Sequence, residues 1–166
     1  MPPAREPDTL SAADIQQLAQ LLSRAERRLT RRLARPLEEE GATVEQWRAL
    51  VLLADGAGHT MSEIAEFALL PSPSNTRLID RMVADNLVYR KADMRDRRRV
   101  LVHVTARGRT LHRHLDRRVE RDRDTILVDG VPGDLHQLAA CLADLFTAVT
   151  HEHSKDRSGG DSPCKS

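Results

Sequence analysis

Aromatic residues are nearly absent from this chain of 166 residues, which contains one tryptophan, one tyrosine and two phenylalanines. Its hydrophobic core must therefore be filled mainly by leucine, valine, isoleucine and alanine, which favours helices packed against helices. With 40% apolar and 31% charged residues, the composition is that of a globular protein, and the length fits one domain with helical extensions. The expected fold class is mainly α.

Long hydrophobic runs are also missing. The longest one, residues 49–54, is far shorter than the roughly 20 residues that a membrane-spanning helix needs. No charged-then-apolar signal segment opens the chain, so we expect a cytoplasmic protein without a membrane partner. Of the two cysteines, Cys164 lies in a polar segment and Cys141 at the edge of an apolar helical stripe. We expect no disulfide between them and interpret Cys141 as a small core residue.

Catalytic and metal-binding motifs are not found in the sequence. It contains no glycine-rich phosphate loop, nucleophile elbow or constellation of paired carboxylates. His112 and His114 lie about 200° apart around a helix, so they cannot chelate one ion from one face. The spacing of His112 and Asp116 is more often that of a solvated contact. We therefore expect no enzymatic step, metal site or cofactor.

The net formal charge of +1 conceals a basic stretch. Between residues 71 and 99, eight basic side chains face four acidic ones, a local charge of +4. Screening confines electrostatic fields to roughly 8–10 Å, so a phosphate backbone responds to this local charge. The stretch ends in a turn-like tip, residues 93–99, that leads directly into an alternating strand. A strand pair with an arginine tip is typical of winged DNA-binding heads.

Capping residues and hydrophobic periodicity predict the order of the elements. Ser11 with Asp14 opens a long helix, rich in arginine outside, whose apolar stripe runs from Ile15 to Leu37 and which bends at Pro36. This stripe exceeds what one small head can cover, so a second copy of the chain is expected against it. Further helix starts are Thr43 with Gln46, Thr60 with Glu63, Ser72 with Pro73 at the first helical position, and Thr105. The expected helices are residues 43–54, 61–68, 72–85, 105–126 and 135–149, with strands at 87–91 and 99–104 and a break at 131–133.

The helix expected at residues 72–85 has a polar outward side. Ser72 and Ser74 lie at its N-terminus, where free N–H groups and the helix dipole favour phosphates or base edges. Arg77, one turn further, is placed to contact guanine, and Arg81 lies nearer to the phosphates. The alternative is an ordinary solvated face on which Asp80 pairs with Arg77 or Arg81.

The tip between the two strands is the second candidate DNA contact. Asp96 and Arg98 are two residues apart in an extended segment, so they share a side and can pair. In that pair Asp96 would hold the arginine outward. The alternative is a charged turn whose only role is to keep the protein soluble.

This organisation resembles the MarR (multiple antibiotic resistance regulator) family of transcription factors. The resemblance covers roughly residues 11–150 and is carried by residues 63–66, 73–82, 86–88, 93–98, 104–105 and 108. It implies a winged helix-turn-helix homodimer whose two heads occupy successive major grooves of a pseudo-palindromic operator. It also implies a repressor released by a small phenolic or lipophilic effector. Arg97 and Arg98 match the family's wing arginines, which contact the minor groove.

The sequence departs from the family pattern at four positions, one of which is Pro71, expected to make the turn more rigid. Leu69 stands where a turn glycine is common, and Met94 replaces a proline that is frequent at the start of the wing. Asn75 replaces a usually apolar residue on the inward side of its helix. Asn75 is therefore a weaker candidate for a base contact than Arg77.

The sequence thus predicts a flexible N-terminus (1–10), a winged helix domain (11–150) and a disordered tail (151–166). Within the domain, 11–40 and 106–150 are expected to be dimerisation helices and 43–105 the DNA-binding head. Two alternatives stay open, a winged protein-interaction module and a small-molecule or metal-binding protein without DNA binding. The expected contacts to operator DNA are Ser72, Pro73, Ser74, Thr76, Arg77, Arg81, Arg95, Arg97, Arg98 and Arg99; an effector pocket is expected at Leu22, Trp47, Leu50 and Leu115.

Overall fold

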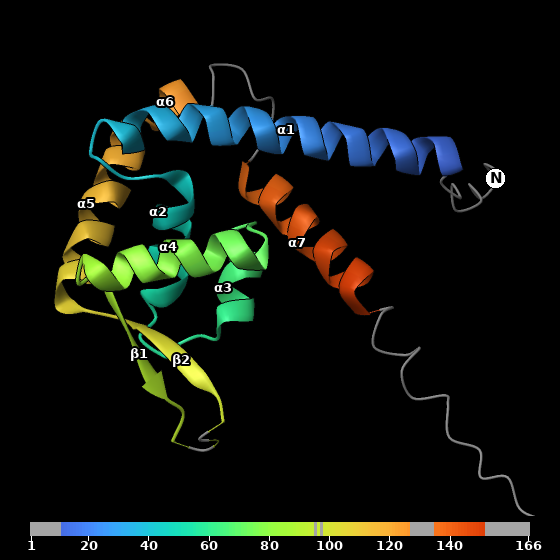
Figure 1. Ribbon diagram of the computed structural model, residues 1–166. Helices are drawn as coiled ribbons and strands as arrows, with labels where there is room; N and C mark the ends of the chain where they lie inside the picture. Colours follow the sequence, from blue (N-terminus) through green and yellow to red (C-terminus); the bar gives the residue numbers. More distant parts are fainter. Residues whose placement is uncertain (1–10, 95, 97, 127–134, 152–166) are drawn as a thin grey trace, which may run out of the picture. The chain divides into compact units, whose positions relative to one another are not determined.

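The computed structural model describes residues 11–94, 96, 98–126 and 135–151, and the chain divides into two units, residues 1–127 and 128–166. The second unit contains α7 (Leu135–His151). The fold is mainly helical with one two-stranded antiparallel sheet, as the composition predicts (Figure 1). The first unit contains α1 (Ala12–Glu38), α2 (Val44–Leu53), α3 (Met61–Phe67), α4 (Ser72–Ala84), β1 (Val88–Ala92), β2 (Val100–Val104), α5 (Ala106–Arg121) and α6 (Arg123–Ile126).

Side-chain caps set most of the helix starts. The expected capping boxes of Ser11 with Asp14 and of Thr60 with Glu63 are both confirmed. Thr105 accepts the N–H of Gly108 at the start of α5, also as expected. At the start of α2, Thr43 accepts the N–H of Gln46, which is one of the two bonds of the expected box.

Two expected helix boundaries are wrong. The N-cap of α4 is Pro71, not Ser72, so Ser72 is the first helical residue. Pro71 and Pro73 both have φ fixed near helical values, and neither has an N–H to satisfy, so the helix starts one residue early without a side-chain cap. The helix expected at 105–126 is interrupted at Asp122, where α5 ends and α6 begins. No glycine or proline marks this break; α6 turns to pack against α1.

The hydrophobic core lies where α1 to α5 meet the sheet, and its side chains are aliphatic. Trp47 packs at its edge, and its indole N–H donates to Asp116 Oδ1 at 2.8 Å. Pro36 lies inside α1 without ending it. The largest fully buried apolar side chains are Leu37, Leu50, Leu53, Ile64, Ile79, Met82, Val88, Val102 and Leu115.

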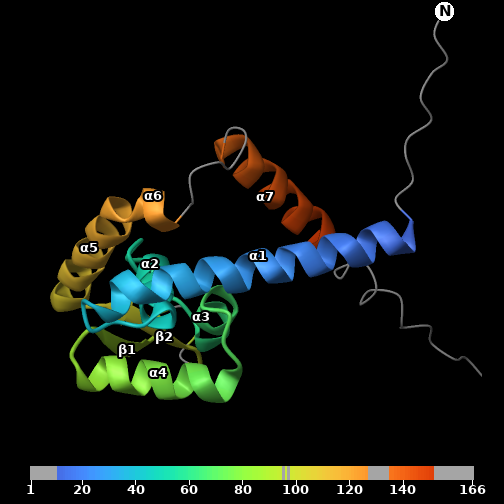
Figure 2. The ribbon, with the colours of Figure 1, turned by 90° about the horizontal axis from the view of Figure 1, so that it is seen from above.

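Much of α1 lies outside this core. Leu33 and Leu37 are buried, whereas Ile15 is 57% exposed and its apolar neighbours along the stripe are also exposed. In both views of the unit, the N-terminal part of α1 projects past the helices α2, α3, α4 and α5 (Figures 1 and 2). On α7, Cys141 is exposed, so its interpretation as a core residue is wrong: the apolar stripe of that helix is itself uncovered. Within the described residues, no helix is long and apolar enough to cross a membrane.

The sheet is fastened to α5 by a group of residues that we call the wing clasp, Asn86, Leu87, Thr105 and Gly108. The Thr105 N–H donates to Leu87 O at 3.0 Å, and the Thr105 hydroxyl donates to the carbonyls of Asn86 and Leu87 at 2.7 and 3.0 Å. A Cβ added to Gly108 would lie 2.1 Å from Leu87 O. Glycine is therefore required at 108 for the close approach of α5 to the end of α4.

We expect Gly108→Ala to lower the free energy of unfolding by about 3 kcal/mol, the upper part of the range for overpacked sites, because the clash is with backbone. Urea denaturation followed by circular dichroism measures the change. Gly56→Ala is the matched control: Gly56 has φ +77° but no atom near its added Cβ, so it should cost only about 1 kcal/mol. Equal losses in the two variants would contradict the role of the clasp.

Candidate nucleic-acid interface

A short turn fixes the direction of α4 relative to α3. Leu69 has φ +57° in this turn, the left-handed conformation that the missing family glycine adopts without strain. A leucine there costs about 1–2 kcal/mol. Backbone hydrogen bonds from Leu69 to Glu66 O and from Leu70 to Ala65 O hold the turn. The leucine therefore keeps the helix-turn-helix geometry at some cost in stability.

Asn75 positions α4 from the inside. Its side chain is 1% exposed, and its Nδ2 donates to the carbonyl of Met61 at the start of α3, at 2.7 Å. The amide thus joins the two helices directly. This burial confirms that Asn75 lies on the inward side, and it removes the residue from the set that can touch a base.

The outward side of α4 carries its expected DNA-binding residues. The Thr76 hydroxyl donates to Ser72 O at 3.0 Å, which keeps it close to the helix backbone. Figure 1 shows α4 along the outside of the head, with the two strands leaving from its C-terminal end. Exposed on this helix are Ser72, Pro73, Ser74, Thr76, Arg77 and Arg81.

Asp80, the acid between the two arginines of α4, pairs with a strand residue instead. Arg90 Nη2 lies 2.7 Å from Asp80 Oδ1. Among the described residues, no carboxylate lies within ion-pair distance of Arg77 or Arg81. The alternative in which Asp80 pairs with one of them is therefore not observed, and both guanidinium groups face solvent. The role of Arg90 was not predicted, because a contact between a helix and a strand ten residues later leaves no periodic signal.

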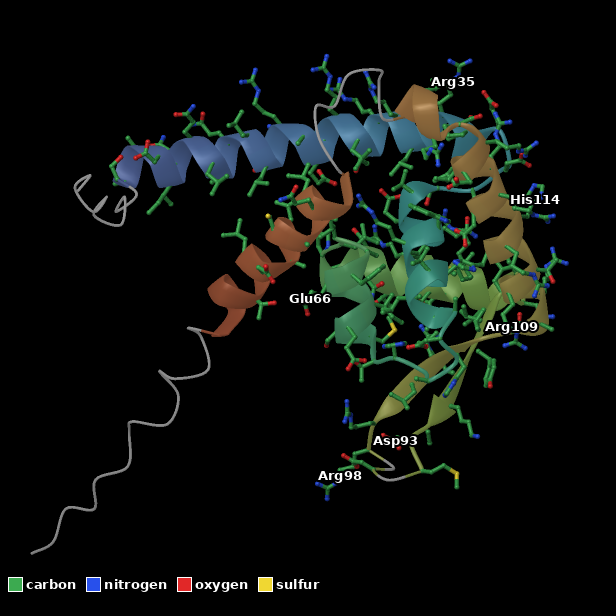
Figure 3. The ribbon with its side chains drawn as sticks, turned by 180° about the vertical axis from the view of Figure 1, so that it is seen from behind. Arg35, Glu66, Asp93, Arg98, Arg109 and His114 are labelled. Carbon is green, nitrogen blue, oxygen red and sulfur yellow. The ribbon has the colours of Figure 1, made fainter. Side chains whose placement is uncertain are left out.

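The wing consists of β1, β2 and the tip between them. The strands pair in register from Val88 with Val104 to Ala92 with Val100, close to the expected ranges. In the tip, the Asp93 N–H donates to Arg99 O and the Arg99 N–H to Asp96 O, both at 2.9 Å. Figure 3 shows Arg98 at the far end of the wing, pointing away from the head. Arg98 and Arg99 are exposed, and the expected contacts Arg95 and Arg97 lie outside the described residues.

The expected pairing of the Asp96 and Arg98 side chains is wrong. Asp96 Oδ1 accepts the backbone N–H of Arg98 at 3.0 Å. A short aspartate side chain reaches an amide two residues ahead without ordering a long arginine, so the turn satisfies the carboxylate locally. Asp96 therefore shapes the backbone of the tip and leaves the guanidinium of Arg98 free to face a ligand.

His59 supports the base of the wing and was missed in the sequence. It exchanges two backbone hydrogen bonds with Val102, at 3.0 and 2.8 Å, and so forms an isolated antiparallel bridge to β2. Its ring nitrogens lie 2.9 Å from Asp55 Oδ2 and 3.6 Å from Glu63 Oε2. An isolated bridge of one residue has no alternation that a sequence pattern could reveal.

Glu63 links the cap of α3 to the wing electrostatically. Mainly the backbone N–H of Thr60 holds the pKa of Glu63 below its ordinary value, and the positive charges of His59 and Arg99 lower it further. The same carboxylate thus caps α3 and attracts the arginine that ends the tip.

The residues expected to line an effector pocket are mostly core residues. Leu50 and Leu115 are fully buried, and Trp47 packs against the same cluster. Leu22 is 37% exposed on the outer part of α1. The structure brings the first three together and leaves Leu22 apart, and their role in effector binding stays a prediction. Among the described residues, no group of three potential metal ligands is close enough to hold an ion.

These elements define a winged helix-turn-helix protein. A sequence model of the MarR family matches residues 40–99. The homoprotocatechuate degradative operon repressor of Escherichia coli is 26% identical over 126 residues, which are 75% of this chain and 84% of the repressor. In sequence the chain is similar to MarR-family regulators over these residues.

Solved structures of other proteins share the fold. A cysteine-to-serine mutant of MarR from E. coli, complexed with operator DNA, has a TM-score of 0.65 and 22% identity, covering 80% of this chain and 95% of MarR. BpsR from Bordetella bronchiseptica, whose structure concerns regulation of DNA binding by 6-hydroxynicotinic acid, has a TM-score of 0.64 and 22% identity. That match covers 78% of this chain and 98% of BpsR.

If α4 contacts bases and the wing contacts phosphates, substitutions in the two elements should differ in kind. Arg77→Ala should lose about 1–3 kcal/mol of binding free energy and relax base preference. Arg98→Ala should weaken binding to all duplexes and reduce the salt slope by about 1. Mobility-shift titrations with operator and scrambled duplexes measure both effects, and Arg113→Ala on α5 is the control. Parent-like binding by both variants would show that the assignment is wrong.

The lowered pKa of Glu63 predicts a loss of stability in acid. Because its pKa is lower in the folded protein, the ionised carboxylate contributes stability above its ordinary pKa of 4.5. This contribution disappears as the pH falls through the folded value. We expect urea denaturation between pH 7 and pH 3 to show a smaller decrease for Glu63→Gln than for the parent. Glu66→Gln, on the same helix and outside the capping box, should follow the parent; identical curves for all three proteins would contradict this account.

Proposed function

We propose that this protein is a DNA-binding transcriptional repressor that acts as a homodimer and responds to a small-molecule effector. The observation that carries the proposal is the exposure of Arg77 and Arg81, free of ion pairs within the described chain, beside a wing tipped with arginine. Similarity to the MarR family supports the same conclusion, since the related E. coli protein is named as a repressor.

In this proposal α4 enters the major groove. Arg77 is one turn inside the helix, where it can donate two hydrogen bonds to guanine O6 and N7. Arg81 lies one turn further and would contact phosphate. The N-terminal residues Ser72 to Thr76 meet the backbone or base edges, where the helix dipole favours negative charge. Each head then reads one half-site, with centres about 10 base pairs apart.

The wing would hold the neighbouring minor groove. Arg98 and Arg99 extend from the tip, and Arg95 and Arg97 are proposed to act with them. A narrow minor groove rich in A·T pairs concentrates negative potential and favours inserted arginines. The pair of Asp80 and Arg90, at 2.7 Å, neutralises the acid nearest to the phosphates without using Arg77 or Arg81.

A second copy of the chain would cover the exposed apolar side chains of α1 and α7. Ile15, Leu18, Leu22 and Leu29 on α1, and Leu138 and Leu142 on α7, are all at least 37% exposed. An exposed apolar stripe on a helix, as each of these two helices has, usually marks an interface. The two heads of such a dimer match a pseudo-palindromic operator.

For the effector we propose a hydroxylated aromatic carboxylic acid. The related repressor is named for homoprotocatechuate degradation, and the structure of BpsR concerns 6-hydroxynicotinic acid. An effector that lowers operator affinity must itself bind less tightly to the DNA complex, since coupling is reciprocal. The proposed contacts are Trp47, with Leu50 and Leu115 behind it in the core, and Leu22 on the exposed part of α1.

Selection of bound duplexes from a random library, at controlled salt, tests the proposal directly. We expect a pseudo-palindromic site and an affinity that falls steeply with salt, because phosphate contacts release counterions. Adding 6-hydroxynicotinic acid or homoprotocatechuate as probes should weaken the complex if the effector class is right. Absence of any duplex binding at low salt would instead favour the protein-interaction alternative.

A further inference from the structure

The outer face of α1 carries an unusual density of arginine. Six of the twelve residues from Arg24 to Arg35 are arginines. At 100° per residue, Arg24, Arg28, Arg31 and Arg35 fall within an arc of about 60°, and we call these four the α1 arginine stripe. Leu22, Leu29 and Leu33 lie on the opposite side of the same helix. These leucines therefore lie on the side away from the stripe, whereas the exposed Leu21 lies beside it.

The stripe is exposed, and the acidic residues nearest to it, Glu38 and Glu39, lie beyond its C-terminal end, away from Arg24, Arg28 and Arg31. All four arginines are exposed. The acid within this stretch, Glu26, lies on another side of the helix, where its Oε1 accepts hydrogen bonds from Arg48 and Thr30. Glu39 lies 3.4 Å from Arg35, an exposed pair at i, i+4 spacing that contributes little. The local charge of residues 24–35 is +5, larger than the +4 of the whole DNA-reading stretch.

The composition of the stripe indicates the class of partner. A protein interface needs apolar or aromatic residues at its centre, and the stripe contains none. A helix that lies in a membrane surface inserts its leucines into lipid. Here Leu33 is buried in the core, and the partly exposed Leu22 and Leu29 are assigned to the proposed dimer contact. Electrostatic attraction is therefore the interaction by which the stripe would recognise a partner. A straight row of arginines about 16 Å long suits a linear polyanion. A DNA duplex, with one phosphate per about 3.4 Å on each strand, is such a partner.

The position of the stripe excludes the operator itself as that partner. Figure 3 places Arg35 on α1 and Arg98 at the wing tip at opposite ends of the first unit. The two arginines point away from each other, so a duplex lying along α4 and the wing does not pass the stripe. A contact at both places requires two separate segments of DNA.

We propose that the α1 arginine stripe binds the phosphate backbone of a second DNA segment, without sequence preference, while the head holds the operator. The dimer would then bridge two duplexes. This inference rests on the proposed function, because the head must hold the operator. A second segment of the same DNA molecule then has a high effective concentration near the stripe. The contact is purely electrostatic and should therefore disappear at moderate salt.

The test is a bridging assay with the full chain. Operator duplex is fixed to beads and saturated with protein, and a labelled duplex without operator sequence is added at low salt. We expect the parent to retain the label. The variant Arg24→Gln/Arg28→Gln/Arg31→Gln should retain roughly tenfold less or lower, and its salt slope for the second duplex should fall by about 3. Its binding to operator should be unchanged.

A matched control removes the same charge from another helix. Arg113, Arg117 and Arg121 are exposed on α5, and their triple glutamine variant should bridge like the parent. Equal bridging by the α1 variant, or no bridging by a parent that holds operator, would overturn the inference. The inference would also be overturned if anionic vesicles or polyglutamate released the label and unlabelled duplex did not. The partner of the stripe would then be a membrane or an acidic peptide. If the parent does not bind operator, the proposed function fails. The stripe can then still be tested by titrating the labelled duplex in solution with both triple variants and comparing their affinities.

Discussion

The contact between α5 and the end of α4 is the constraint on which the rest of the head depends. In the wing clasp, one threonine side chain caps α5, since it accepts the N–H of Gly108, and also donates to the carbonyls of Asn86 and Leu87. The absence of a side chain at Gly108 lets the helix approach Leu87 closely. Because α4 ends and β1 begins near this point, α4 and the wing share one support. Their relative direction is thereby set by the long helix α5.

The distribution of charge follows from what the local structure satisfies. Acidic residues around the reading surface are used internally: Asp80 pairs with Arg90, Asp96 accepts an amide of the tip, and Glu63 caps α3. The arginines that remain exposed then dominate the field at short range. The same separation occurs on α1, where Glu26 is held by Arg48 and Thr30. A protein with a net charge of +1 can thus present two strongly basic surfaces at opposite ends of one unit.

Much of the candidate site could be predicted from the sequence because its determinants are local. The outward position of Arg77 and Arg81, the inward position of Asn75, and the caps at Thr60 and Thr105 follow from helix periodicity and from residues three positions apart. The predictions that failed were those in which two groups compete for one hydrogen bond or one position. Asp96 was expected to pair with a guanidinium and instead took the nearer amide, and Ser72 lost the cap position to Pro71. At the tip a nearer partner thus satisfies the carboxylate, whereas α4 begins without a side-chain cap, at prolines whose φ is already fixed near helical values.

By itself the sequence determined the order of helices and strands, the aliphatic core, and which face of α4 and of α1 carries arginine. These features depend on the spacing of apolar, capping and charged residues along the chain, which can be determined from the sequence alone. Only the tertiary structure decided that Asp80 pairs with Arg90, that His59 forms a bridge to β2, and that Arg35 and Arg98 point to opposite ends. Such relations join residues distant in sequence, and they arise from packing of the whole core, for which no local pattern exists.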